Sequence, residues 1–152
     1  MLNKIKKTLF IIGILSFTGC SSIEKKSCIN SFNNRVAFLT QDIQIINSIN
    51  LIDKNIFCGS QPYSEFYNNL DTFLLGLSDK KKKIFYTTLF FTEFHRNENG
   101  GEFVEFLLEN KINIYDQYIK IISDHELLSQ MKYTDEELQN LKILGEILKG
   151  ID

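Results

Sequence analysis

Several residue types that would point to particular classes of protein are scarce in this chain. Among its 152 residues there are one Pro and eight Gly, which excludes a collagen-like or proline-rich fibre. The 17 Lys and Arg residues do not outnumber the 19 Asp and Glu residues, so the charge gives no indication of nucleic-acid binding. Hydrophobic residues make up 43% of the chain, which excludes a disordered tail and suffices for one compact domain.

Residues and motifs that carry catalysis are also few. The chain has two His residues, and no GxSxG, HExxH, P-loop or GxGxxG motif. We interpret His95 as a residue that suits a helix C-terminus. His125 is interpreted as a surface residue, because its acidic neighbours Asp124 and Glu126 would point in different directions on a helix. The sequence therefore predicts no enzyme, no cofactor and no metal, and an envelope hydrolase that uses His95 or His125 remains an alternative.

The first twenty residues have the features of a secretory signal. Lys4, Lys6 and Lys7 precede an apolar stretch over residues 9–17, and small residues follow it. A membrane-spanning helix needs roughly 20 apolar residues, and this stretch supplies about half of them. The pattern therefore favours a cleaved signal peptide over a membrane span.

A lipid anchor is indicated where this segment ends. Phe17-Thr18-Gly19-Cys20 resembles the lipobox of bacterial lipoproteins, in which the Cys becomes the first mature residue and carries acyl chains such as palmitate. The resemblance covers these residues alone, and Phe17 stands where that family usually has Leu. It implies acylation of Cys20 and, because Ser21 is not the Asp that favours inner-membrane retention, an outer-membrane protein facing the periplasm. Cleavage after Ser21, which would release a soluble secreted protein, is the alternative.

These features predict three parts: a signal peptide over 1–19, a lipidated flexible tether over 20–27 and a helical domain over 28–152. Loss of residues 1–19 removes three Lys and no acidic residue, so the mature chain has 14 basic and 19 acidic residues and is mildly acidic. Once Cys20 is assigned to lipid, Cys28 and Cys58 remain as a pair in an oxidising compartment, which predicts a disulfide. A thiol nucleophile or a metal site is the weaker interpretation of this pair, because no CxxC spacing occurs.

Helical periodicity dominates the domain. Apolar residues spaced three and four apart predict helices over about 29–49, 60–77, 78–95, 102–110 and 113–131, the last as one long or two short helices. The Asn- and Gly-rich residues 97–101 predict a turn. Thr134 and Glu137 form a capping box that begins a helix over 135–149, and Gly150 is expected to end it in the left-handed conformation. The predicted fold is all-α, a bundle of about five to seven helices.

The helix expected over 78–95 is unusual because apolar groups surround its axis. Its rings either form an aromatic core with neighbouring helices or expose a patch made of Tyr86, Phe90 and Phe94 that anchors a protein partner. Lys80–Lys83, at its start, form either a solvated turn or a site for acidic groups.

A second candidate surface is acidic. Glu98, Glu102, Glu105 and Glu109 recur at spacings of four, three and four, so they share one side of a helix. They form either a solvated face or a docking surface for a basic partner.

Together these features lead us to expect a lipid-anchored, disulfide-containing envelope protein that binds a protein partner. Small acidic helical lipoproteins of this kind include immunity proteins that inhibit toxins delivered into the periplasm, a similarity of style without a shared motif. A structural or assembly accessory of the outer membrane is the alternative.

Overall fold

A computed structural model describes Ser22 to Ile151, and these residues form ten helices and no strand. The all-α prediction is confirmed, but the helices are more numerous and shorter than the expected five to seven. The expected signal peptide and the acylation site Cys20 lie outside the described residues.

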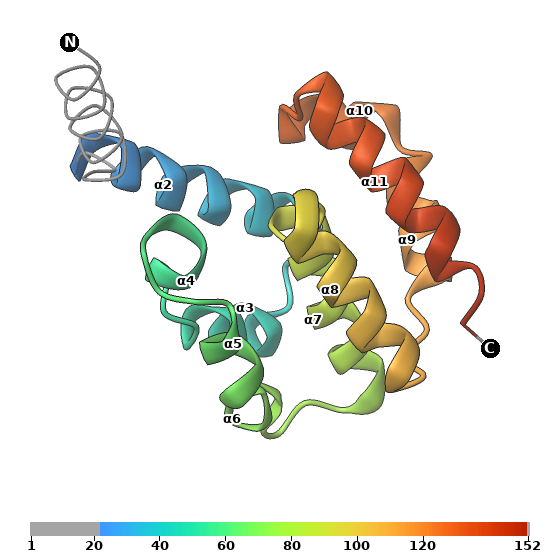
Figure 1. The fold of residues 1–152 in the computed structure, drawn as a ribbon, viewed down its shortest axis with the longest axis horizontal. Helices are drawn as coiled ribbons and strands as arrows, with labels where there is room; N and C mark the ends of the chain where they lie inside the picture. Colours follow the sequence, from blue (N-terminus) through green and yellow to red (C-terminus); the bar gives the residue numbers. More distant parts are fainter. Residues whose placement is uncertain (1–21, 152) are drawn as a thin grey trace, which may run out of the picture.

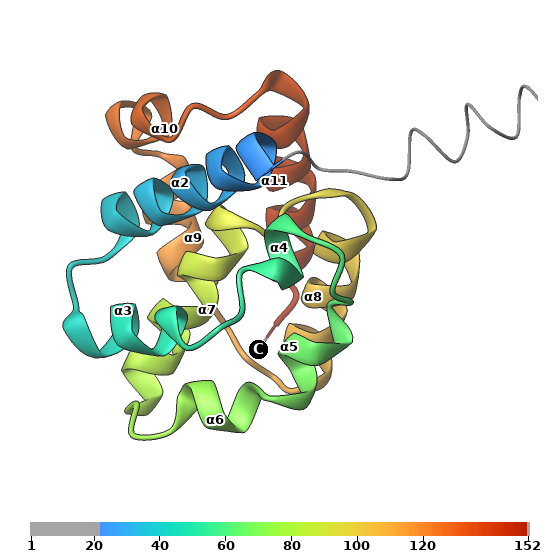
Figure 2. The ribbon, with the colours of Figure 1, turned by 90° about the vertical axis from the view of Figure 1, so that its left-hand side faces the viewer.

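The helices follow one another with short connections (Figure 1). They are α2 (Ser22–Leu39), α3 (Ile43–Asn50), α4 (Asn55–Cys58), α5 (Ser64–Asn68), α6 (Leu70–Leu74), α7 (Asp79–Thr92), α8 (Asn97–Glu109), α9 (Tyr115–Ile122), α10 (His125–Met131) and α11 (Asp135–Leu148). Helix α7 packs against α2, α3 and α9, while α8 packs against α11. Figure 2 shows α7 enclosed by these elements, so it is the central helix of the bundle.

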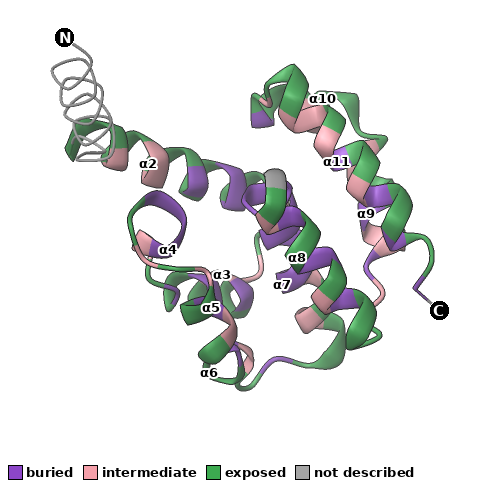
Figure 3. Ribbon diagram, in the orientation of Figure 1, coloured by how far each residue is buried: buried purple, intermediate pink, exposed green. Residues whose placement is uncertain are grey.

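Burial explains the position of α7. Every residue from Phe85 to Thr92 is buried, whereas α8 and α11 each present an exposed side (Figure 3). A helix that is apolar on all sides is stable only when neighbours cover it on all sides. The lysine-rich start projects beyond this core, and there Lys81 pairs with Asp42 at 2.9 Å.

The single helix expected over 29–49 is wrong, because the chain breaks into α2 and α3 at residues 40–42. The Asp42 side chain accepts hydrogen bonds from the backbone N–H groups of Gln44 and Ile45, and the Thr40 hydroxyl accepts one from Asp42. Such side chains stabilise a new helix start in competition with helix continuation. The apolar spacing continues across the break, which is why periodicity alone misses it.

The expected flexible tether is also corrected, since α2 begins at Ser22 and residues 22–27 are helical. The helix expected over 60–77 is instead two short helices, α5 and α6, separated at Asn69. At that break the Asn69 side chain donates to the carbonyl of Glu65, which satisfies a group at the end of α5. Residues 113–131 contain two short helices, α9 and α10, which confirms one of the two expectations for this segment.

The turn expected at residues 97–101 is wrong, because these residues form the first turns of α8. A Cβ atom on Gly100 would lie 2.6 Å from Leu144 Cδ1 and 2.7 Å from the carbonyl oxygen of Phe94. Glycine is therefore needed there for the close approach of α8 to α11.

The capping box of Thr134 and Glu137 that begins α11 is confirmed. Gly150 has no positive φ, so the expected left-handed end of α11 is wrong.

Candidate functional site

The aromatic patch proposed from the sequence is not at the surface. Tyr86 is 4% exposed, and Phe90 and Phe94 are fully buried. Phe94 stacks on Phe103 of α8 with ring centroids 4.2 Å apart. These rings belong to the core, which confirms the first of the two interpretations of this helix, and the alternative that they form an exposed patch for a partner is wrong.

The acidic stripe does lie at the surface. Glu98, Glu102, Glu105 and Glu109 are exposed on α8, and none of them pairs with a cation among the described residues. Helix α8 contains no Lys or Arg that could offset them. We call these four residues the acidic face.

The acidic face has an energetic consequence for its own helix. Like charges four residues apart disfavour a helix by about 0.2–0.5 kcal/mol per pair, and an acidic residue in the last turn opposes the helix dipole. Helix α8 carries two such pairs, Glu98 with Glu102 and Glu105 with Glu109. The neighbouring helix α11 exposes two large apolar side chains, Ile143 (54%) and Ile147 (46%).

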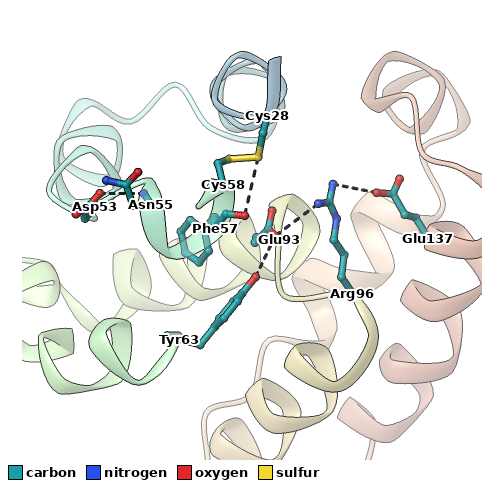
Figure 4. The surroundings of a disulfide bond; sticks show 9 residues. All are labelled: Cys28, Asp53, Asn55, Phe57, Cys58, Tyr63, Glu93, Arg96 and Glu137. Atoms are coloured by element: carbon teal, nitrogen blue, oxygen red, sulfur yellow. Dashed lines mark hydrogen bonds and ion pairs between the residues drawn. A yellow bond between two sulfur atoms is a disulfide. The ribbon is translucent and has the colours of Figure 1, made fainter. Parts of the chain in front are cut away.

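A largely buried charge cluster joins α2 to the start of α11. Glu137 at the start of α11 is its centre: Arg35 Nη2 lies 3.2 Å from Glu137 Oε2, and Arg96 Nη2 lies 3.1 Å from Glu137 Oε1. Arg96 Nη1 is also 3.6 Å from Glu93 Oε1 (Figure 4). We call Arg35, Glu93, His95, Arg96 and Glu137 the charge cluster.

His95 is the residue whose placement differs most from expectation. It was interpreted as a surface or helix-end residue, but it is fully buried beyond the end of α7. Its Nδ1 lies 3.1 Å from the carbonyl oxygen of Phe90, and its Nε2 lies 3.7 Å from Glu137 Oε1. Burial lowers the pKa of His95, and the contact with Glu137 opposes that shift only in part. No substrate could reach this ring without opening the core, so its evident role is structural.

The pKa values of the two carboxylates in the charge cluster shift in opposite directions. Burial raises the pKa of Glu93, although Arg96 and the Tyr63 hydroxyl, which donates to Glu93 Oε1 at 3.1 Å, counteract it. Burial acts the same way on Glu137, but the contacts with His95, the Thr134 N–H and Arg35 outweigh it and hold its pKa well below its usual range. Glu137 is therefore the permanent negative charge that compensates the cations around it.

Sequence patterns identified Glu137 as part of a capping box and did not identify the cluster. In the sequence, Arg35 is a polar residue between apolar residues of the helix expected over 29–49, and nothing distinguishes it from other polar residues there. No local signal joins it to a carboxylate 102 positions away. A charged residue on the inner side of an amphipathic helix would have been the one available hint.

The predicted disulfide is confirmed: Cys28 near the start of α2 is bonded to Cys58 at the end of α4, with Cα atoms 5.6 Å apart (Figure 4). Asp53 helps to shape the bonded loop by accepting a hydrogen bond from the N–H of Asn55. The loop also packs into the core through Phe57, which lies edge-on to Phe94. The bond therefore fixes the first turns of α2 to the body of the domain.

A groove of about 500 Å³ runs between α2 and the end of α10. Polar residues line most of it, among them Ser27, Asn30, Asn34 and Lys132. It is open to solvent, none of the acidic-face residues lines it, and Arg35 of the charge cluster forms part of its wall.

His125, the second His, is exposed at the first position of α10, where Asp124 caps the helix. Within residues 22–151, no group of His, Cys, Asp and Glu side chains is arranged to hold a metal ion. In the same part of the chain, no helix combines the length and apolar character needed to cross a membrane. Comparison of the chain with protein families, curated proteins and solved structures finds no match.

Proposed function

We propose that this chain is an exported lipoprotein of the cell envelope, anchored through acylated Cys20, and that its domain acts by binding a protein partner. The observation that carries the proposal is the Cys28–Cys58 disulfide. Disulfides of this kind persist in oxidising compartments outside the cytosol. The lipobox-like Cys20 precedes Cys28 by only eight residues, so the features for export, anchoring and oxidation are adjacent in the chain.

The binding surface that we propose is the acidic face. Its four carboxylates are exposed and unpaired within the described residues. The like-charge pairs and Glu109 in the last turn disfavour α8, although Glu98 in the first turn suits the helix dipole. Such a concentration of charge is expected where it is retained for a partner rather than for stability. A basic protein surface is the complementary partner, and such complementarity chiefly increases the rate and specificity of association. An inhibitor of a periplasm-targeted toxin, as in immunity proteins, is the function that fits these features best.

The first test is chemical. Mass spectrometry of the protein purified from membranes is expected to show a chain that begins at an acylated Cys20, and Cys20→Ser is expected to release the protein from the membrane. An intact Met1 together with free thiols at Cys28 and Cys58 would contradict the proposal.

The second test concerns the acidic face. The binding partner is sought first among secreted proteins encoded beside the gene, with growth protection and affinity as the measurements. Replacing Glu98, Glu102, Glu105 and Glu109 by Gln is expected to weaken binding by tenfold or more, on the order of 1.4 kcal/mol, and to reduce its salt dependence. The matched control replaces the exposed residues Glu65, Glu126, Glu136 and Glu146 by Gln, which changes the net charge equally and is expected to leave binding intact.

Three outcomes would redirect the proposal. Equal weakening by both variants would show that net charge, not the acidic face, determines affinity. Capture of large envelope complexes without a neighbouring toxin would favour the accessory role. A hydrolytic activity that is lost in His125→Ala would favour an enzyme.

A further inference from the structure

We infer that the first turn of α2 lies in the headgroup layer of a phospholipid membrane, so that a rigid helix, rather than a flexible tether, holds the domain against the lipid surface. This inference rests on the proposed acylation of Cys20 and deepens it, because it assigns the part of the domain that contacts the membrane.

The number of residues between Cys20 and α2 limits how far the helix can lie from the acyl chains. One residue, Ser21, separates Cys20 in the sequence from Ser22, the first described residue of α2. Two residue steps span at most about 7 Å even when fully extended. The headgroup region of one leaflet is roughly 5–8 Å thick, so an acylated Cys20 leaves Ser22 within or at the edge of that region.

No flexible segment follows that could let the domain move away. Helix α2 is continuous from Ser22 to Leu39, and at about 1.5 Å per residue Cys28 lies only about 9 Å along the axis from Ser22. The Cys28–Cys58 disulfide then fixes this part of α2 to α4, and Phe32 and Val36 anchor the next turns in the core. The connection from acyl chain to core is therefore short and helical throughout.

The side chains of the first turn suit a membrane surface. Ile23 is 78% exposed, so its apolar side chain is available to a lipid surface. At about 100° per residue it lies roughly 140° around the helix from Cys28, so it points away from the domain. Lys26 is exposed on an adjoining side, where its amine can reach lipid phosphates while its methylene chain stays near the apolar boundary.

The attraction between the first turn of α2 and the lipid surface needs only to be weak. Glu24 offsets one of the two Lys charges of this turn, so electrostatic attraction to anionic lipids is small. The short connection to acylated Cys20, rather than attraction to lipid, therefore holds this turn at the headgroups.

The inference also gives the domain an orientation. The start of α2 and helix α11 lie towards opposite ends of the longest axis of the molecule (Figure 1). Holding the first turn of α2 at the headgroups therefore directs α11, with its exposed Ile143 and Ile147, away from the membrane.

Depth-dependent quenching tests this arrangement in the full acylated protein. An environment-sensitive fluorophore is attached through Ile23→Cys or, as the matched control, through Ile147→Cys, another exposed Ile on a helix. The native cysteines are blocked by acylation or by the disulfide. The protein is reconstituted in phosphatidylethanolamine–phosphatidylglycerol vesicles that contain lipids spin-labelled at the headgroup. The expected result is a loss of fluorescence at position 23 and none at position 147.

A longer connection between Cys20 and α2 tests whether the short chain, rather than affinity of the first turn for lipid, holds α2 at the membrane. Insertion of about ten Gly and Ser residues between Ser21 and Ser22 creates the flexible tether that the chain lacks, and it is expected to abolish the quenching at position 23. Quenching that persists with the insertion overturns the inference, as does absence of quenching in protein whose acylation mass spectrometry has verified. A missing acyl mass instead contradicts the proposed function, so the two failures are distinguishable.

Discussion

Glu137 is the residue on which most of the buried charges depend. It contacts two guanidinium groups and an imidazole while its carboxylate also completes the capping box with the N–H of Thr134. Its side chain is 16% exposed and that of Arg35 7% exposed, so water cannot replace the pairing between them.

We predict that Glu137→Gln destabilises the protein by about 3–5 kcal/mol, because it removes the carboxylate paired with the buried Arg35 guanidinium, which then keeps only the Met131 and Lys132 carbonyls as hydrogen-bond acceptors. Denaturant unfolding followed by circular dichroism measures the difference. Glu136→Gln is the control: this neighbour is exposed and its replacement is expected to change stability by less than about 0.5 kcal/mol. Equal stabilities of the two variants would show that the cluster is not a stabilising unit.

His95 makes stability depend on pH. Burial lowers its pKa below the ordinary value of 6.5, so in that range the unfolded chain binds a proton that the folded chain does not. Stability is therefore present in full above the unfolded pKa and is lost as the pH falls below it. Glu137, with a lowered pKa, loses its contribution only at more acidic pH, below its ordinary value of 4.5. Glu93, with a raised pKa, changes stability with the opposite sign.

We predict that the wild-type protein loses up to about 1 kcal/mol per pH unit as the pH falls from about 6.5 to 5.5, and that His95→Asn lacks this slope. Asn is chosen because its amide can still donate to the carbonyl of Phe90. Thermal unfolding across this range gives the slopes, and their difference isolates His95 from the contribution of Glu93. A wild-type protein that gains stability on acidification relative to the variant would show that the folded state protonates the ring.

At the scale of helices, two glycines distinguish close packing from open surface. A Cβ atom on Gly145 of α11 would overlap the ring of Tyr118 of α9, whereas one on Gly101 of α8 would meet nothing within 4 Å. The crossing of α9 and α11 therefore requires the absence of a side chain at residue 145. Position 101 carries no such requirement.

We predict that Gly145→Ala destabilises the domain by about 1–3 kcal/mol through overpacking, while Gly101→Ala stabilises it by roughly 0.5–1 kcal/mol through helix propensity. Both are measured by denaturant unfolding. Equal effects of the two substitutions would contradict the tight crossing of α9 and α11.

The same scale shows what could be predicted from the sequence. The start of α11 was predictable because a capping box consists of residues within one turn, and the helical class followed from spacing. The start of α8 was not, because the glycines at 100 and 101 resemble a turn locally and become helical through packing of α8 on α11. The acidic face was identified correctly as exposed, whereas Phe90 and Phe94 could be assigned to the core only once α7 was known to be central.

At the scale of the whole molecule, the disulfide is the only covalent cross-link between side chains in the described part of the chain. It closes a loop with a sequence separation of 30 between α2 and α4. We predict that the double variant Cys28→Ser/Cys58→Ser is less stable by about 3–4 kcal/mol, the value expected from the entropy of a loop of this length. Denaturant midpoints with and without reductant provide the measurement. A reductant should lower the wild-type midpoint and leave that of the variant unchanged.

The pairing of Arg35 with Glu137 also constrains the order in which the chain can mature. Under the proposed export, Arg35 is among the first residues of the domain to leave the cytosol, and its carboxylate partner follows 102 positions later. Until then the guanidinium must stay hydrated, so α2 cannot settle on α7 and α10 in its final position. A chain truncated before α11 should consequently remain a client of chaperones, although its Cys28–Cys58 loop can already close.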